Sequence, residues 1–183
     1  MSDEDLARQS QGGDLASFEE LVRRYENRVY AFAFQCCGHE ADAREVTQDT
    51  FVKAFAAIAQ FDPSRSFAAW LFTIARRKSI DCFRARIPTG DQPVLEELDQ
   101  DDPAELLARR DEAQALWRRA RAALSDSQFQ SLWLRYAEDM DIAGIARVLG
   151  KTQTHVKVLL FRARHTLAAE LEPARAPLVL TAK

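Results

Sequence analysis

The sequence predicts an all-α protein in which a flexible acidic linker joins two small helical domains. Apolar residues recur at spacings of three and four within two long blocks, which is the spacing of one helix face. Glycine and proline number only six each in 183 residues, whereas strands and tight turns use more of both. A polar strip with three prolines, from Pro88 to Pro103, separates the blocks and has the composition of a linker.

The first block is expected to hold three helices. The first runs from about residue 15 to Gly38, and Ser17 with Glu20 has the spacing of a capping box at its start. The second begins near Asp42 and ends at the segment FDPSRS, where Pro63 is incompatible with continuous helix. The third follows that segment and ends before the linker.

The second block predicts a helix-turn-helix unit from about Leu124 to Leu171. Ser125 and Asp126 can cap a first helix, Gly150 stands where a short second helix ends, and Thr152 can cap the third. Two short helices joined by a turn that contains glycine are typical of this DNA-binding motif. The apolar positions expected to be buried are Phe129, Leu132, Trp133 and Tyr136, then Ile142, Ile145, Ala146 and Leu149, then Val156, Leu160, Ala163 and Leu167.

Charge is segregated along the chain, although the net charge is only −3. Residues 66–87 hold five bases and one acid, residues 88–105 hold seven acids and no base, and residues 117–170 hold nine bases and five acids. Two basic blocks therefore flank an acidic strip, which is an arrangement that a nucleic-acid-binding protein can use.

The N-terminal turns of the third helix carry the polar groups that could read DNA. Hydroxyl, amide and imidazole groups can contact base edges or phosphates, and basic side chains add phosphate attraction. The alternative is a helical hairpin inside a bundle, with its charges solvated. The candidate residues of this surface are Thr152, Gln153, Thr154, His155, Lys157, Val158 and Arg162.

Four segments in order resemble one family. RYAEDMDIAGIARVLGKTQTHVKVLLFRARHTL is similar to the C-terminal DNA-reading domain of the extracytoplasmic-function sigma factors of the sigma-70 family. FEELVRRYENRVY, DAREVTQDTFVKAF and FAAWLFTIARRKSIDCFRAR resemble the three conserved helices of its N-terminal domain. The resemblance covers about residues 15–171. It implies region 2 over 1–87, an acidic linker over 88–104, region 4 over 105–172 and a tail over 173–183.

The resemblance implies a subunit that binds core RNA polymerase and promoter DNA. Region 4 would read the −35 element as duplex, and region 2 would melt the −10 element. Because an acidic and amide face suits a basic partner, Glu45, Gln48 and Asp49, which share one helix face, are the expected polymerase contacts. The alternative for this face is a solvated surface. An anti-sigma factor is an expected further partner.

The basic third helix and the loop before it are the expected −10 surface. Strand opening needs backbone attraction and groups that capture an unstacked base. Aromatic side chains at helical spacing have a core role as the alternative, and Phe67 is assigned to the core. The candidate contacts are Phe61, Arg65, Ser66, Trp70, Arg76, Arg77 and Lys78.

The chain departs from the family pattern at five positions. Arg77 stands where asparagine is usual, so a phosphate contact is expected there in place of a base contact. In the reading helix, Val158 and Leu159 replace serine and arginine, which removes a hydroxyl and a guanidinium. Apolar side chains can still touch a thymine methyl. Gly144 replaces glutamate, and Ser125 replaces proline. These differences predict a −35 preference unlike the commonest one.

Cofactor, metal and catalytic sites are not expected. Cys36, Cys37 and His39 cluster, but a closed zinc site needs four ligands and Cys82 lies in another element. Three cysteines with one adjacent pair fit a reducing cytoplasm, where the resemblance implies a bacterial protein that an anti-sigma factor can hold at the membrane. No run approaches the ~18 apolar residues of a membrane span.

Two other classes of function compete with a sigma factor. A self-standing helix-turn-helix regulator would explain the C-terminal half, but it would not need the Glu45, Gln48 and Asp49 face or the basic aromatic helix. An enzyme is disfavoured, because no nucleophile–base pair, glycine-rich phosphate loop or paired-carboxylate pocket is recognisable in the sequence.

Overall fold

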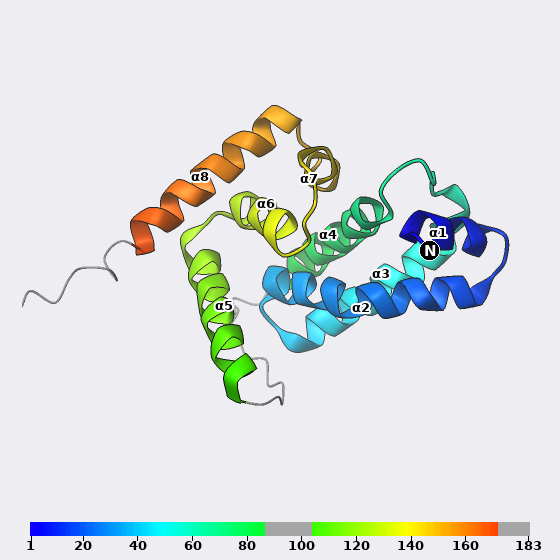
Figure 1. Ribbon diagram of the computed structural model, residues 1–183, viewed down its shortest axis with the longest axis horizontal. Helices are drawn as coiled ribbons and strands as arrows, with labels where there is room; N and C mark the ends of the chain where they lie inside the picture. Colours follow the sequence, from blue (N-terminus) through cyan, green and yellow to red (C-terminus); the bar gives the residue numbers. More distant parts are fainter. Residues whose placement is uncertain (87–103, 172–183) are drawn as a thin grey trace, which may run out of the picture.

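The computed structural model describes residues 1–86 and 104–171, and every regular element within them is a helix (Figure 1). This confirms the all-α prediction for the described part of the chain. The helices are α1 (Asp3–Gln11), α2 (Leu15–Cys37), α3 (Glu40–Ala57), the 3-10 turn η1 (Ile58–Gln60), α4 (Phe67–Arg86), α5 (Ala104–Ala123), α6 (Asp126–Tyr136), α7 (Ile142–Leu149) and α8 (Gln153–Leu171). The expected linker and tail lie outside the described residues, apart from Ala104 at the start of α5.

Helix α1 was not anticipated from the sequence. Ser2 caps it, because its side chain accepts a hydrogen bond from the Asp5 N–H at 3.1 Å. Three acids occupy its first turn, where negative charge is favourable to the helix dipole. Leu6 and Ala7 are buried against the rest of the fold. The short helix is therefore held by its cap and by two apolar side chains.

Helix α2 begins with a cap that differs from the predicted one. Asp14 is the N-cap and accepts from the Ala16 N–H at 3.1 Å. Ser17, expected to form a capping box with Glu20, lies inside the helix, and its hydroxyl donates to Asp14 at 2.6 Å. That prediction was wrong because aspartate three residues earlier is an equally good cap. The other end is as expected, since Gly38 adopts φ 70° after the last turn.

Helices α2, α3 and α4 pack together with α1 as an N-terminal unit. The predicted stripe of α3 is buried at Val46, Thr50 and Ala54. Pro63 lies between η1 and α4, in a segment that is not helical, as the sequence predicted. This segment connects the C-terminal end of α3 to the start of α4, so its path fixes which side chains stand at the N-terminus of α4.

Helices α6, α7 and α8 form the predicted helix-turn-helix. Ser125 caps α6, and its N–H donates to Gln128 Oε1 at 3.0 Å. Asp141 caps α7 by accepting from the Gly144 N–H at 2.7 Å, and a Cβ at Gly144 would lie 2.9 Å from that carboxylate. Gly144 thus permits the cap. One burial prediction was wrong: Tyr136, the last residue of α6, is 56% exposed.

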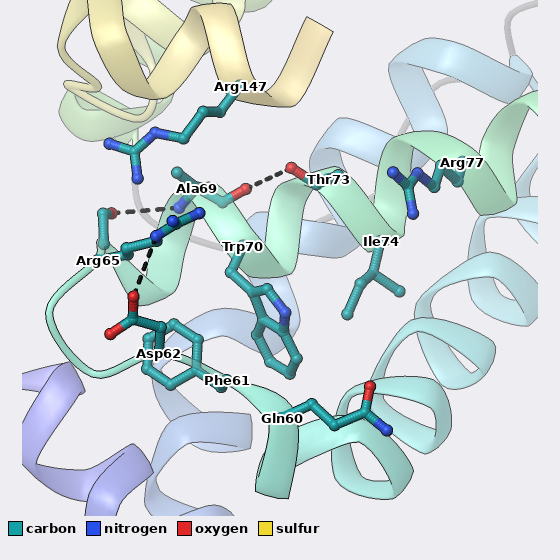
Figure 2. A pocket seen from close by; sticks show the side chains of 11 residues that line it. Gln60, Phe61, Asp62, Arg65, Ala69, Trp70, Thr73, Ile74, Arg77 and Arg147 are labelled. Atoms are coloured by element: carbon teal, nitrogen blue, oxygen red, sulfur yellow. Dashed lines mark hydrogen bonds and ion pairs between the residues drawn. The ribbon is translucent and has the colours of Figure 1, made fainter. Parts of the chain in front are cut away.

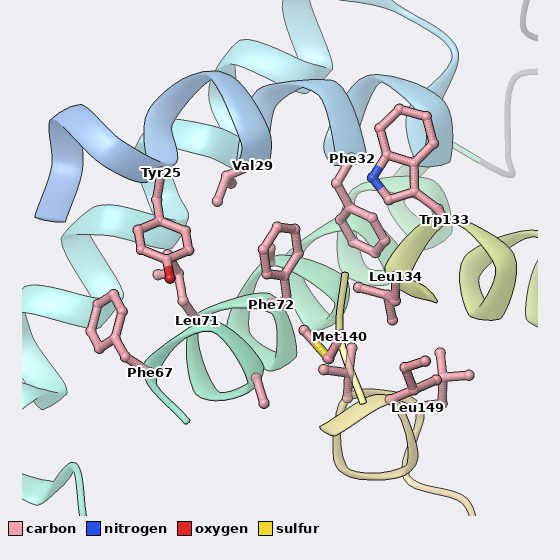
Figure 3. Close-up of a cluster of buried hydrophobic side chains, with 14 of the residues drawn as sticks. Tyr25, Val29, Phe32, Phe67, Leu71, Phe72, Trp133, Leu134, Met140 and Leu149 are labelled. Carbon is pink, nitrogen blue, oxygen red and sulfur yellow. The ribbon is translucent and has the colours of Figure 1, made fainter. Parts of the chain in front are cut away.

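The C-terminal unit, α5 to α8, shares one apolar core with the N-terminal unit. Helix α7 packs against α4. Figure 3 shows Phe32 of α2 and Phe72 of α4 facing Trp133 and Leu134 of α6. The sequence showed that each helix has an apolar face, but it did not show that faces from the two units meet.

Polar contacts accompany this packing. Arg28 pairs with Glu138 at 2.8 Å, and the Glu138 side chain is only 3% exposed. Arg76 Nε donates to Gln130 Oε1 at 3.0 Å, and Arg121 Nε donates to the Gln35 carbonyl at 3.0 Å. Burial raises the pKa of Glu138, and the charge of Arg28 opposes that rise. The interface is therefore both apolar and specifically hydrogen-bonded.

Among the described residues, no helix combines the length and the apolar character that crossing a membrane requires.

Candidate nucleic-acid interface

The first turns of α8 are presented to solvent, as the helix-turn-helix prediction requires. Thr152 is the cap, and its hydroxyl accepts from the His155 N–H at 3.2 Å. Gly150, at φ 63°, ends α7 and turns the chain toward α8. All seven predicted reading residues are exposed, namely Thr152, Gln153, Thr154, His155, Lys157, Val158 and Arg162.

The two apolar departures in α8 have different roles. Val158 is 42% exposed and lies on the open face of the helix, whereas Leu159 is 8% exposed and belongs to the core. The change from arginine to Leu159 therefore adds packing inside the protein, and only Val158 changes the chemistry of the exposed face.

Phe161 is an exposed aromatic residue on the same face that sequence reasoning missed. It is 65% exposed and stands seven residues after Thr154, two helical turns along the same face. It also follows Val158 by three residues, so the two apolar side chains adjoin. The spacing from Thr154 was the available signal in the sequence.

A pocket of about 330 Å³ opens between η1 and the first turns of α4. Figure 2 shows Phe61, Arg65 and Trp70 around it, together with Arg77 further along α4. Ser66 also lines the pocket and caps α4, because its hydroxyl accepts from the Ala69 N–H at 3.2 Å. Five of the seven predicted −10 residues thus converge on one cavity.

The aromatic side chains of this pocket are partly structural. Phe61 is 4% exposed and Phe67 is 1% exposed, with ring centroids 5.6 Å apart. Trp70 is half-buried, and its ring lies 5.1 Å from that of Phe61. Phe67 is therefore a core residue, as expected. Phe61 lines the pocket with a buried ring, and Trp70 lines it with the more accessible ring.

Most basic residues of this surface already have partners within the protein. Arg65 pairs with Asp62 at 3.1 Å, and Lys78 pairs with Asp49 at 2.8 Å. Arg76 donates to Gln130 of α6, and burial lowers its pKa. Arg77 is exposed at the pocket. Arg76 and Lys78 therefore do not line the pocket, and three of the four predicted cations are neutralised or bonded internally.

Arg147 of α7 also lines this pocket, although it belongs to the C-terminal unit (Figure 2). Sequence reasoning missed it because its position depends on α7 packing against α4. A cation from the helix-turn-helix therefore stands at the edge of the cavity formed by the N-terminal unit.

The predicted acidic face lies on the outer side of α3. Glu45 and Gln48 are exposed, and Asp49 is half-exposed in its ion pair with Lys78. Gln48 lines a groove of about 680 Å³ between α2 and α3, which Val52 also lines. Val52 is 62% exposed. This face thus combines acid, amide and apolar groups next to a groove.

The three cysteines are free thiols, of which Cys37 is buried and Cys36 and Cys82 are partly buried. Burial raises the pKa of Cys36 to about 12, and its sulfur lies 3.7 Å from Gln130 Nε2 of the other unit. Burial likewise raises the pKa of Cys37 to about 12. Within residues 1–86 and 104–171, no three histidine, cysteine or acidic side chains are grouped as metal ligands would be.

Comparison with known proteins gives a consistent assignment. Residues 21–87 match the family described as Sigma-70 region 2, and residues 115–167 match Sigma-70, region 4. The ECF RNA polymerase sigma factor BldN of Streptomyces coelicolor is 31% identical over 90% of this chain, which spans 64% of BldN. The RNA polymerase sigma factor YlaC of Bacillus subtilis is 29% identical over 87% of this chain and 94% of the length of YlaC.

Two solved structures resemble the whole described arrangement. CnrH in complex with the cytosolic domain of CnrY has a TM-score of 0.68 and 30% identity, over 95% of this chain and 99% of CnrH. The sigma factor RpoE of Bartonella quintana, in complex with the anti-sigma factor NepR, shares the fold with a TM-score of 0.70 at 24% identity, over 86% of this chain and 98% of RpoE. With both conserved regions in order and relatives of this kind along most of its length, the chain belongs to the extracytoplasmic-function sigma factors of the sigma-70 family.

Proposed function

We propose that this sigma factor binds core RNA polymerase and starts transcription at promoters that it reads with two separate surfaces. Helix α8 reads the −35 element as duplex, and the pocket before α4 captures a base of the melted −10 strand. The observation that carries the proposal is the convergence of Arg65, Ser66, Trp70 and Arg77 on one cavity, in the same chain as an exposed helix-turn-helix.

The chemistry of α8 supports duplex reading. The N-terminal turns of the second helix of this motif enter the major groove, and here they present an amide, hydroxyls and Lys157 to solvent. Amide and hydroxyl groups read base edges, while lysine attracts phosphate. Val158 and Phe161 add apolar groups that can contact thymine methyls, so we expect a −35 preference that includes thymine.

The cavity before α4 supports capture of an unpaired base. Its volume of about 330 Å³ exceeds what one nucleobase needs, and Trp70 offers a ring for stacking. Arg65, Arg76, Arg77 and Lys78 supply positive charge for the strand backbone. Since Arg76 and Lys78 have internal partners, DNA must exchange with Gln130 and Asp49 to engage them.

The face formed by Glu45, Gln48 and Asp49 is the proposed polymerase contact. Acidic and amide groups suit a basic partner surface, and the neighbouring groove with Val52 offers apolar contact area. Asp49 then has two roles, because it also holds Lys78 of the −10 surface at 2.8 Å. Binding of polymerase to this face would therefore influence a residue that meets DNA.

The packed arrangement of the two units is proposed to be the form that is free of promoter. The −35 and −10 elements lie about 25 base pairs apart, or about 85 Å of duplex at about 3.4 Å per base pair. Arg147 at the pocket is only six residues from Gln153 of α8, which spans at most about 22 Å. The units must therefore separate before both elements can be read.

An anti-sigma factor is the proposed further partner, and it would hold the packed form. The CnrH structure, which resembles this arrangement over 95% of the chain, contains the cytosolic domain of CnrY. The protein is then a binding subunit and not an enzyme. Its work on polymerase and DNA places it in a bacterial cytoplasm, where a membrane-anchored partner could retain it.

The test is transcription with the full chain, core polymerase and a library of promoter fragments. The proposal expects transcripts from a defined set of promoters, and it expects Glu45→Lys to abolish core binding while −35 duplex binding is kept. Arg8→Ala, on an exposed side chain that pairs with Asp5, is the control. Duplex binding without core binding or transcripts would favour the self-standing regulator instead.

A further inference from the structure

Helix α1 lies outside the residues that match the sigma-70 families, which begin at residue 21. It nevertheless contacts residues 58–67, the segment that supplies part of the lining of the proposed base pocket. Gln11, in its last turn, directs its side-chain amide at two backbone carbonyls of that segment: Nε2 donates to Ile58 O at 2.9 Å and to Phe61 O at 2.6 Å. Because a side-chain NH₂ has two hydrogens, both are used here.

The other end of the segment is held by Glu4, which stands two residues before the buried Leu6 of α1. Glu4 Oε1 accepts from the Phe67 N–H at 3.0 Å. Phe67 is the first residue of α4, where backbone N–H groups have no partner within the helix. Helix α1 therefore bonds to both ends of residues 58–67.

Between those ends the segment is bonded mainly to itself. Arg65 N–H donates to Asp62 O at 3.0 Å, and Ser64 N–H donates to Asp62 Oδ1 at 3.0 Å. Both bonds stabilise a local turn, but they do not fix where the turn points. That direction depends on the two anchored ends, and the pocket residues Gln60, Phe61 and Ser66 lie at or next to those ends.

We propose that Gln11 and Glu4 are positioning residues for capture of the melted −10 base. They hold residues 58–67 so that the pocket has its binding shape before DNA arrives. The inference rests on the proposed function of that pocket. Its physical basis is that a binding group held in place loses little freedom on binding, whereas misplacement by about 1 Å can cost about a hundredfold in rate.

The decisive variant is Gln11→Leu, which keeps the size of the side chain and removes both donors. Gln9→Leu is the matched control, because it makes the same change on the same helix but loses a bond to Ser17 at 2.7 Å, away from the pocket. Glu4→Leu should resemble Gln11→Leu. Glu4→Gln keeps an acceptor oxygen for the Phe67 N–H and should behave like the natural protein.

The measurement is open-complex formation by the full chain with core polymerase, on a promoter that it opens and on a series with one abasic site at each −10 position. The position at which the abasic site weakens opening by the natural protein identifies the captured base. Gln11→Leu should lower opening of the intact promoter by about tenfold, with little further loss on that abasic promoter. Gln9→Leu should leave both unchanged.

Two outcomes overturn the inference, and they are distinguishable from each other. If Gln11→Leu lowers opening equally on the intact and the abasic promoter, or on neither, α1 does not position the pocket, although base capture stands. If no abasic position affects the natural protein, base capture itself fails, and the positioning role fails with it. Binding of −35 duplex by each variant verifies that the helix-turn-helix remains folded.

Discussion

The two proposed DNA surfaces differ in how many of their side chains already have hydrogen-bond or ion-pair partners within the protein. On α8, the side chains of Gln153, Thr154 and Lys157 are exposed and make no hydrogen bond or ion pair within the described residues. On α4, Arg76 is bonded to Gln130 and Lys78 to Asp49. If both surfaces bind DNA as proposed, we expect the −35 surface to bind without breaking internal bonds, whereas Arg76 and Lys78 of the −10 surface must first exchange Gln130 and Asp49 for nucleic acid.

From this difference we expect the interface between the two units to control access to the proposed −10 surface. Helix α7 covers part of α4 and brings Arg147 to the pocket, while the proposed reading residues of α8 are exposed to solvent. A change that weakens the interface should therefore release the −10 surface without altering the −35 surface. A change on α8 should do the reverse.

The largest effect is expected from Arg28→Ala. This substitution removes the charged partner of the Glu138 carboxylate, whose side chain is only 3% exposed, and such a loss costs about 3 kcal/mol. The ratio of packed to separated units should fall about a hundredfold. Small-angle X-ray scattering should show a larger radius of gyration for the variant.

The matched control is Arg23→Ala on the same helix, where the arginine is 78% exposed and pairs with Glu20. It should leave the scattering unchanged. The double variant Arg28→Ala with Glu138→Leu should recover much of the packing, because no buried charge remains. An unaltered radius for Arg28→Ala would show that the pair does not hold the units together.

The second effect is on α8. Lys157→Ala should weaken binding of −35 duplex about uniformly across sequences and reduce the dependence of binding on salt by about one released ion. Titration by fluorescence anisotropy at several salt concentrations measures both. Arg8→Ala removes the same charge far from α8 and should change neither. A salt dependence identical to that of the natural protein would remove Lys157 from the phosphate contacts.

A smaller effect is expected for Phe161→Ala. The ring is 65% exposed, so its loss should leave thermal stability unchanged and lower −35 affinity several-fold, within the about 1–3 kcal/mol typical of a good base contact. Replacing −35 thymines by uracil removes the methyl groups. The natural protein should bind uracil DNA more weakly than thymine DNA, whereas Phe161→Ala should bind the two with nearly equal affinity.

Tyr136→Ala is the control for this experiment, because Tyr136 is also an exposed aromatic residue, at 56%, but lies on α6. If the variant and the natural protein respond equally to uracil, Phe161 does not contact a methyl group.

Features within one helix could be predicted from the sequence. The spacing of Ile145 and Leu149, the glycine at 150 and the cap at Thr152 are local signals, and the structure confirms all of them. The spacing of Glu45 and Gln48 likewise placed them on one outer face. These features follow from helix geometry alone.

Features that depend on which helices meet could not be predicted. Leu159 is buried and Phe161 exposed because the partners of α8 fix the buried side, and a periodic pattern does not name the partners. Arg147 reaches the pocket only through the packing of α7 on α4. Helix α1 was missed because, in nine residues, it offers little apolar periodicity.

The smallest effect is the response of the packed form to pH. Burial raises the pKa of Glu138 above its ordinary value of 4.5 when the units are packed, so the packed form binds the proton more tightly than the separated form. Packing is therefore favoured as pH falls toward 4.5, and that gain is lost as pH rises through the raised value. The radius of gyration should decrease on acidification over this window, and Glu138→Gln, which cannot titrate, should flatten the response. A decrease of the same size in the variant would assign the effect to other groups, and Glu138 would then contribute only its ion pair with Arg28.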